Sequence, residues 1–105
     1  MRQITRLAAD AFIKGHNFGS SNTTVGLDAN GVVRMFLHGN LIAEQNLTGE
    51  LRMTLAGWNT PTTRERLNGL LEVLGKTPGL RFCQKNFDAH YGAREIESDE
   101  WITIT

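Results

Sequence analysis

The chain has 105 residues, with eleven basic and eleven acidic side chains and a single cysteine, Cys83. This length predicts one domain over residues 1–105, large enough for a hydrophobic core. One thiol cannot form an internal disulfide, and no Cys/His set has zinc spacing, so we expect no metal and a reducing compartment such as the cytoplasm. No apolar run approaches the ~20 residues of a membrane span, so no membrane association is expected.

The zero net charge hides an uneven distribution of charge along the chain. Residues 1–87 carry ten Lys or Arg and six Asp or Glu. Residues 88–105 carry one Arg and five Asp or Glu. Either the acidic tail folds back and pairs with the basic body, or two charged poles remain and one of them meets a charged partner. Without an overall basic excess, the composition favours a protein over a nucleic acid as that partner.

The first predicted element is an amphipathic helix that Gly15 can close in the left-handed conformation. Its apolar stripe has helical spacing and consists of Ile4, Leu7, Ala8, Ala11 and Phe12. The next segment, HNFGSSN at 16–22, is polar and predicts a loop.

The apolar period then changes to two, which predicts four strands in an antiparallel meander. These strands contain Val25 and Leu27, then VVRMFL at 32–37, then LIAEQ at 41–45, and finally Leu51, Met53 and Leu55. Turns are expected at DANG (28–31), HGN (38–40) and NLTGE (46–50). One face of this meander should be covered and the other partly exposed to solvent.

A second helix begins in the segment GWNTPTTRERL. Pro61 suits the first helical position and makes Thr60 the N-cap, while Thr62 with Glu65 offers an alternative capping box. Four leucines, Leu67, Leu70, Leu71 and Leu74, should cover the sheet, and Gly75 should end the helix before KTPG at 76–79. Gly69 lies mid-helix, where we expect close approach to a strand or to another helix.

The tail predicts three more strands, with WITIT at 101–105 as the last and AHYGARE at 89–95 as a tight turn before Ile96. The predicted fold class is therefore α+β: a small single domain with an antiparallel meander and two helices, in the order helix, four strands, helix, three strands.

No set of side chains has the pattern of a catalytic or cofactor site. Cys83 lies in a predicted strand and is expected in the core, and His16, His38 and His90 fall in predicted turns. No serine stands in a nucleophile elbow, no spacing indicates a metal, and no glycine loop fits a phosphate. We therefore predict no catalytic residue, no metal and no cofactor, and a non-catalytic protein is favoured over an enzyme.

Two segments remain as candidate binding sites. The polar start of the second helix has free backbone N–H groups and nearby cations that could hold an anion; its candidates are Trp58, Asn59, Thr62, Thr63, Arg64 and Arg66. A capped helix with solvated arginines is the competing interpretation, and a lone tryptophan is more often part of the core. In the turn at 38–40, His38 and Asn40 flank a glycine; His38 has no expected role in forming the turn and is therefore free to act.

Three stretches also carry a resemblance: NTTV at 22–25, LHGNLIA at 37–43 and GWNTPTTRERLNGL at 57–70. Over about residues 20 to 70 the chain resembles a group of small proteins encoded by tailed bacteriophages. The resemblance carries over no activity, cofactor or catalytic residue. It implies expression in the cytoplasm of an infected bacterium, where small phage accessory proteins commonly bind a host or viral macromolecule.

The sequence is compatible with three functions. The favoured one is a binding module for a protein or nucleic acid. The second is a small enzyme for a phosphorylated or nucleotide-like substrate, which requires His38 to lie near the start of the second helix. The third is a structural homo-oligomer assembled through exposed strand edges.

Overall fold

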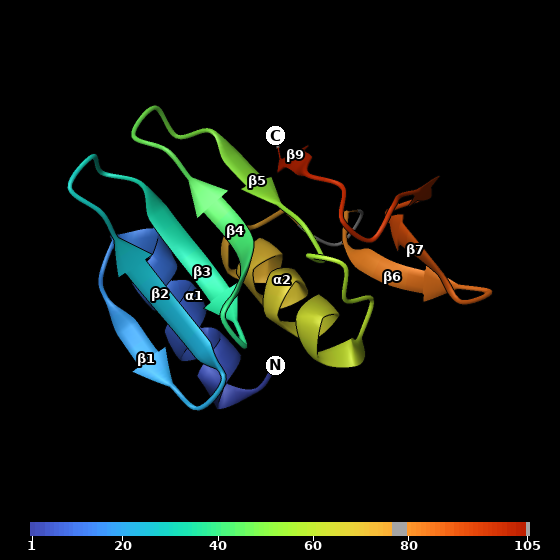
Figure 1. Ribbon diagram of the computed structural model, residues 1–105, viewed down its shortest axis with the longest axis horizontal. Coiled ribbons are helices and arrows are strands. Elements are labelled where there is room, and N and C mark those ends of the chain that lie inside the picture. Colours follow the sequence, from blue (N-terminus) through green and yellow to red (C-terminus); the bar gives the residue numbers. More distant parts are fainter. Residues whose placement is uncertain (77–79, 105) are drawn as a thin grey trace.

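A computed structural model describes residues 1–76 and 80–104 and shows two helices packed against one face of a curved antiparallel sheet (Figure 1). The helices are α1 (Gln3–Lys14) and α2 (Pro61–Val73). The strands are β1 (Phe18–Ser20), β2 (Thr23–Leu27), β3 (Val33–Leu37), β4 (Asn40–Gln45), β5 (Leu51–Met53), β6 (Phe82–Lys85), β7 (Asp88–Tyr91), β8 (Arg94–Glu95) and β9 (Ile102–Ile104). In that part of the chain, neither helix has the length and apolar character needed to cross a bilayer.

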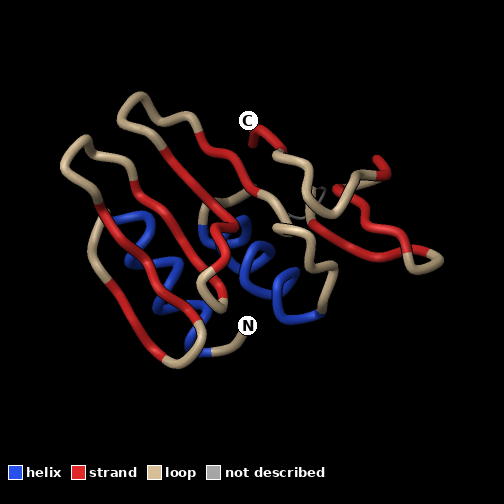
Figure 2. Tube along the Cα trace, in the orientation of Figure 1, coloured by secondary structure: helices blue, strands red, loops and turns tan. Residues whose placement is uncertain are grey.

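The predicted α+β class, with two helices and antiparallel sheets, is confirmed. The main sheet has six strands in the order β1-β2-β3-β4-β5-β9, and β6-β7-β8 form a separate small sheet (Figure 2). Five strands precede α2 and four follow it, so each run has one strand more than expected. The expected KTPG turn and the end of WITIT extend into residues 77–79 and 105, outside the described residues.

Both additional strands come from segments that were predicted to be loops or turns. The segment Phe18–Ser20 forms β1 through backbone pairing with Thr23–Val25, although glycine and serine give it little strand propensity. In AHYGARE, the first residues belong to β7 and the chain reverses at Gly92, so the tight turn lies later than expected. Backbone pairing to a neighbouring strand overrides local composition in both places.

The covered face of the sheet holds the predicted alternation. Val33, Met35 and Leu37 of β3 are buried beneath the helices. Leu67, Leu70 and Leu71 of α2 are buried as well. The stripe of α1 is rotated from the prediction, because Thr5 and Ala9 are buried while Leu7 is 46% exposed. Thr5 lies in the interior, where its hydroxyl accepts a hydrogen bond from Arg66 of α2.

The helices lie unusually close to one another at Gly69. A Cβ atom built on this glycine would lie 2.2 Å from Cγ2 of Thr5 on α1, which is far inside contact distance. The expected reason for a mid-helix glycine, close approach to another element, is confirmed, and the element is α1. Asn68 joins α2 to the small sheet, because its side chain accepts from the Phe82 amide (2.7 Å) and donates to the Phe82 carbonyl (2.8 Å).

The open face of the main sheet carries a ladder of charges across three strands and a turn. Arg34 pairs with Asp28 at 2.7 Å and with Glu44 at 2.9 Å, and Arg52 pairs with Glu44 at 2.8 Å. The Arg52 guanidinium also lies 4.4 Å from the ring centre of Trp101. Glu44 is therefore held by arginines from both neighbouring strands, β3 and β5.

Candidate functional site

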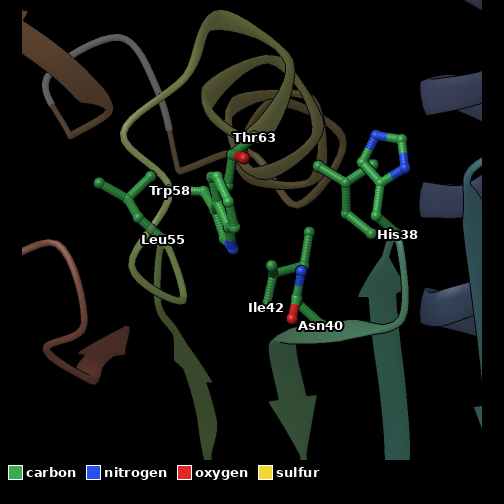
Figure 3. A pocket seen from close by; sticks show the side chains of 7 residues that line it. His38, Asn40, Ile42, Leu55, Trp58 and Thr63 are labelled. Carbon is green, nitrogen blue, oxygen red and sulfur yellow. The ribbon is translucent and has the colours of Figure 1, made fainter.

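Two turns that are distant in sequence meet around one cavity. The β3–β4 turn lies opposite the loop between β5 and α2, and the cavity between them has a volume of about 200 Å³. It is lined by Leu37, His38, Asn40, Ile42, Leu55, Trp58 and Thr63. Figure 3 shows Trp58 and His38 on opposite sides, with Ile42 and Asn40 between them on β4 and Thr63 above them on α2.

His38 is held at the rim by its backbone. His38 and Gly39 are the two central residues of the β3–β4 turn, with φ of 51° and 80°. The His38 N–H donates to the carbonyl of Asn22 at 2.8 Å, which ties this turn to the start of β2. The expectation that His38 has no role in forming the turn is therefore wrong. Its side chain is nevertheless exposed to solvent.

Trp58 is presented by a sharp reversal after β5. Ala56 and Gly57 both have positive φ, 56° and 85°, and the Gly57 N–H donates to the carbonyl of Ser98 at 2.8 Å. Trp58 follows this reversal directly, lines the cavity and is 58% exposed. The expectation that Trp58 belongs to the core is therefore wrong, because its ring borders an open cavity and is not enclosed by other side chains.

The start of α2 is capped as predicted by Thr60. Its hydroxyl accepts from the Thr63 N–H at 3.2 Å and lies 2.9 Å from the Thr63 hydroxyl. The alternative capping box does not form, because Glu65 is engaged by α1. Arg64 donates to the side-chain oxygens of Asn59, at 2.5 Å, and Gln84, at 3.2 Å. Both the cap and Arg64 therefore already have partners within the protein.

Arg66 is a buried cation, only 2% exposed. Its Nε donates to the Thr23 hydroxyl at 2.9 Å, and its Nη1 donates to the Thr5 hydroxyl at 2.9 Å and pairs with Glu65. Its Nη2 donates to Asn22 at 3.3 Å. The guanidinium therefore joins α1, the start of β2 and α2.

Glu65 completes this network from the solvent side. Burial by itself raises the pKa of its carboxyl, but hydrogen bonds from the Thr5 hydroxyl, the Arg2 N–H and Arg66 outweigh burial and hold the pKa below its ordinary value of 4.5. A carboxyl with a lowered folded-state pKa stabilises the fold above its unfolded-state pKa, and that contribution is lost as the pH falls through the folded value.

Glu65→Gln is therefore expected to lower the free energy of unfolding at pH 7, and the difference from wild type should shrink as the pH falls below about 4.5. Urea unfolding at pH 7, 5 and 3.5 measures this difference. Glu72→Gln, on the exposed side of the same helix, is the matched control and should show no such pH-dependent difference. A Glu65→Gln difference that stays constant over this range would contradict the prediction.

The structure brings together four of the eight candidate residues from the two segments: His38, Asn40, Trp58 and Thr63 line the cavity. Asn59 and Arg64 are paired with each other beside the cavity, Thr62 is half-buried outside its lining, and Arg66 lies in the interior. The apolar floor of the cavity was not predicted, because Leu37, Ile42 and Leu55 were expected to belong to the sheet. The available signal was their closeness in sequence to the two candidate segments: Leu37 precedes His38 directly, Ile42 follows Asn40 by two residues, and Leu55 precedes Trp58 by three.

The chemistry of this cavity is that of an apolar pocket with a polar rim. Its floor is aliphatic, one wall is an indole, and His38 and Asn40 can donate or accept hydrogen bonds at the edge. His38 is the only titratable side chain in its lining. Within residues 1–76 and 80–104, no three His, Cys, Asp or Glu side chains are grouped so that they could share a metal ion. This arrangement can bind an apolar group and orient it through the rim.

Comparison with protein families gives a match over residues 1–105 to the family described as Kyanoviridae Gp96 protein. The expected resemblance to phage proteins is therefore confirmed, and it extends beyond the segment 20–70 into the tail. No curated protein and no solved structure matches the chain.

Proposed function

We propose that this chain, which belongs to the Kyanoviridae Gp96 family of phage proteins, is a non-catalytic binding module whose cavity accepts an apolar side chain of a viral or host protein. The proposed setting is the cytoplasm of an infected bacterium, since the family is a phage family. The observation that carries the proposal is the half-exposed Trp58 beside an apolar cavity of about 200 Å³.

Exposed tryptophan at a pocket is typical of protein–protein contacts. Tryptophan is enriched among the few residues that supply most of the binding energy, and such residues cluster at well-packed pockets. A fold that needed Trp58 only for stability would bury its large apolar side chain, whereas this residue is 58% exposed. A peptide backbone passing over the rim could hydrogen-bond to Asn40 and His38 while one side chain enters the cavity.

An enzyme acting on a phosphorylated substrate is less well supported, although His38 and the start of α2 do border the same cavity. That function needs a cation to hold the anion. Arg66 is engaged by four groups in the interior, and Arg64 donates to Asn59 and Gln84. An anion would have to displace these partners, whereas an apolar side chain needs no such change.

Affinity capture from infected-cell lysate tests the proposal. Wild type should retain a specific protein, and Trp58→Ala should weaken that binding at least tenfold, the size expected of a central aromatic contact. Leu47→Ala is the control, because Leu47 is an apolar residue in a different turn that is more accessible (80% exposed) than Trp58. Equal capture by wild type and Trp58→Ala would contradict the proposal, and so would salt-sensitive retention of DNA or RNA without a protein.

A further inference from the structure

The β6–β7 hairpin has at its tip an aromatic side chain that the fold does not use. Lys85 pairs with Asp88, so Asn86 and Phe87 are the two central residues of the turn. Their φ values are 51° and 69°, a conformation that asparagine and glycine adopt readily and that a bulky residue avoids. Phe87 is 88% exposed, so no packing compensates for its unfavourable backbone. Strained, exposed residues of this kind are typical of contact sites.

The tip of this hairpin does not contribute to the cavity of the same molecule, because Phe87 is absent from its lining. Figure 1 shows β6 and β7 at one end of the long axis, beyond α2 and away from the β3–β4 turn. Phe87 therefore lies outside its own cavity and is directed to solvent. It can reach such a cavity in a neighbouring copy.

The ring and the cavity match in size and chemistry. An apolar cavity of about 150 Å³ is known to hold benzene, and the volume here is about 200 Å³. Leu37, Ile42 and Leu55 offer aliphatic contacts, and Trp58 offers an aromatic wall for a second ring. A two-residue turn also presents its ring with little surrounding bulk, which suits entry into a cavity.

Charge does not oppose this contact. The described lining of the cavity holds no Lys, Arg, Asp or Glu side chain. The β6–β7 hairpin carries one charge of each sign, Lys85 and Asp88, on either side of its turn. Entry of the ring therefore requires no charged group of the lining to lose its solvent. The ion pair of the acidic tail, Arg94 with Glu100, lies within the tail.

We propose that the cavity of one copy binds Phe87 of a second copy. The inference rests on the proposed function, since it names the partner of the same cavity. Each molecule contributes its hairpin to one contact and its cavity to another, so the association is head-to-tail. Such contacts produce chains or closed rings rather than a two-fold dimer.

Sedimentation velocity on two complementary variants tests the proposal. Phe87→Gly removes the ring and suits the left-handed turn position, and Asn40→Trp covers the rim of the cavity with a bulky group. Wild type should show a mass that rises with concentration, whereas each variant alone should remain at the 11.7 kDa of one chain. An equimolar mixture should form a dimer, because one variant retains the cavity and the other retains Phe87.

Leu47→Ala is the matched control and should associate as wild type does. Wild type that stays monomeric at all concentrations would overturn the proposal, and so would Phe87→Gly that associates like wild type. If Asn40→Trp fails to fold, as judged by circular dichroism, the comparison of Phe87→Gly with wild type and Leu47→Ala decides the result alone. Thermal unfolding of Phe87→Gly with toluene probes the cavity separately: a raised Tm without any self-association in wild type would retain the proposed function and reject this partner.

Discussion

Replacing Arg66 with alanine is expected to lower the free energy of unfolding by about 3–5 kcal/mol, the range observed when one member of a buried charged network is removed. The substitution removes the donor to the Thr5 and Thr23 hydroxyls and the cation beside Glu65. It also leaves a space where a fully buried side chain had been. Because small domains are stable by only ~5–15 kcal/mol, this loss is a large part of the total.

Equilibrium unfolding in urea at pH 7 measures this effect. Arg66→Lys keeps the charge but cannot reproduce the forked geometry that reaches α1 and β2 together, so it should recover only part of the loss. Arg6→Ala, on the exposed side of α1, should change the free energy of unfolding by no more than about 0.5 kcal/mol. An Arg66→Ala protein within about 1 kcal/mol of wild type would show that the network contributes little to stability.

Gly69→Ala is expected to lower the free energy of unfolding by about 1–3 kcal/mol, the usual cost of overpacking a buried contact. Helix propensity alone predicts the opposite sign, since alanine in a helix is favoured over glycine by roughly 1 kcal/mol. The steric term prevails because the new methyl would lie 2.2 Å from Cγ2 of Thr5, and Thr5 is itself fixed by its bonds to Arg66 and Glu65.

The same urea titration distinguishes the two effects. Gly26→Ala is the matched control, because a Cβ atom at Gly26 would meet no atom within 4 Å, and its change should stay within about 0.5 kcal/mol. A Gly69→Ala protein that is more stable than wild type would mean that α1 moves away at little cost.

Local chemistry made much of the fold predictable from sequence. The Thr60–Pro61 pair specified the start of α2 because capping and a fixed proline φ act over a few residues. The Asp28–Gly31 turn was equally local, since the Asp28 carboxylate accepts from the N–H groups of Asn30 and Val32. Alternating burial along β3 followed from the period of its apolar residues.

The buried role of Arg66 could not be predicted in this way. Arginine is usually exposed, and apart from the adjacent Glu65 the groups that bind it lie 43 to 61 residues earlier in the chain. The rotation of α1 has the same origin, because Thr5 is buried in order to meet that guanidinium. The 38–40 turn and the start of α2 lie at the same cavity. The sequence did not predict this closeness, and only the enzyme hypothesis required it, because sequence spacing does not indicate which turns meet around a cavity.

The position of β9 at the sheet edge affects how the protein can fold during synthesis. Leu51 pairs with Ile104, so one edge of β5 has no hydrogen-bond partner until β9 is synthesised, about fifty residues later. At ~5–20 residues per second, that interval is roughly 3 to 10 s. A nascent chain therefore has an unprotected strand with apolar side chains for seconds, and chaperone capture or pairing between neighbouring nascent chains competes with native closure.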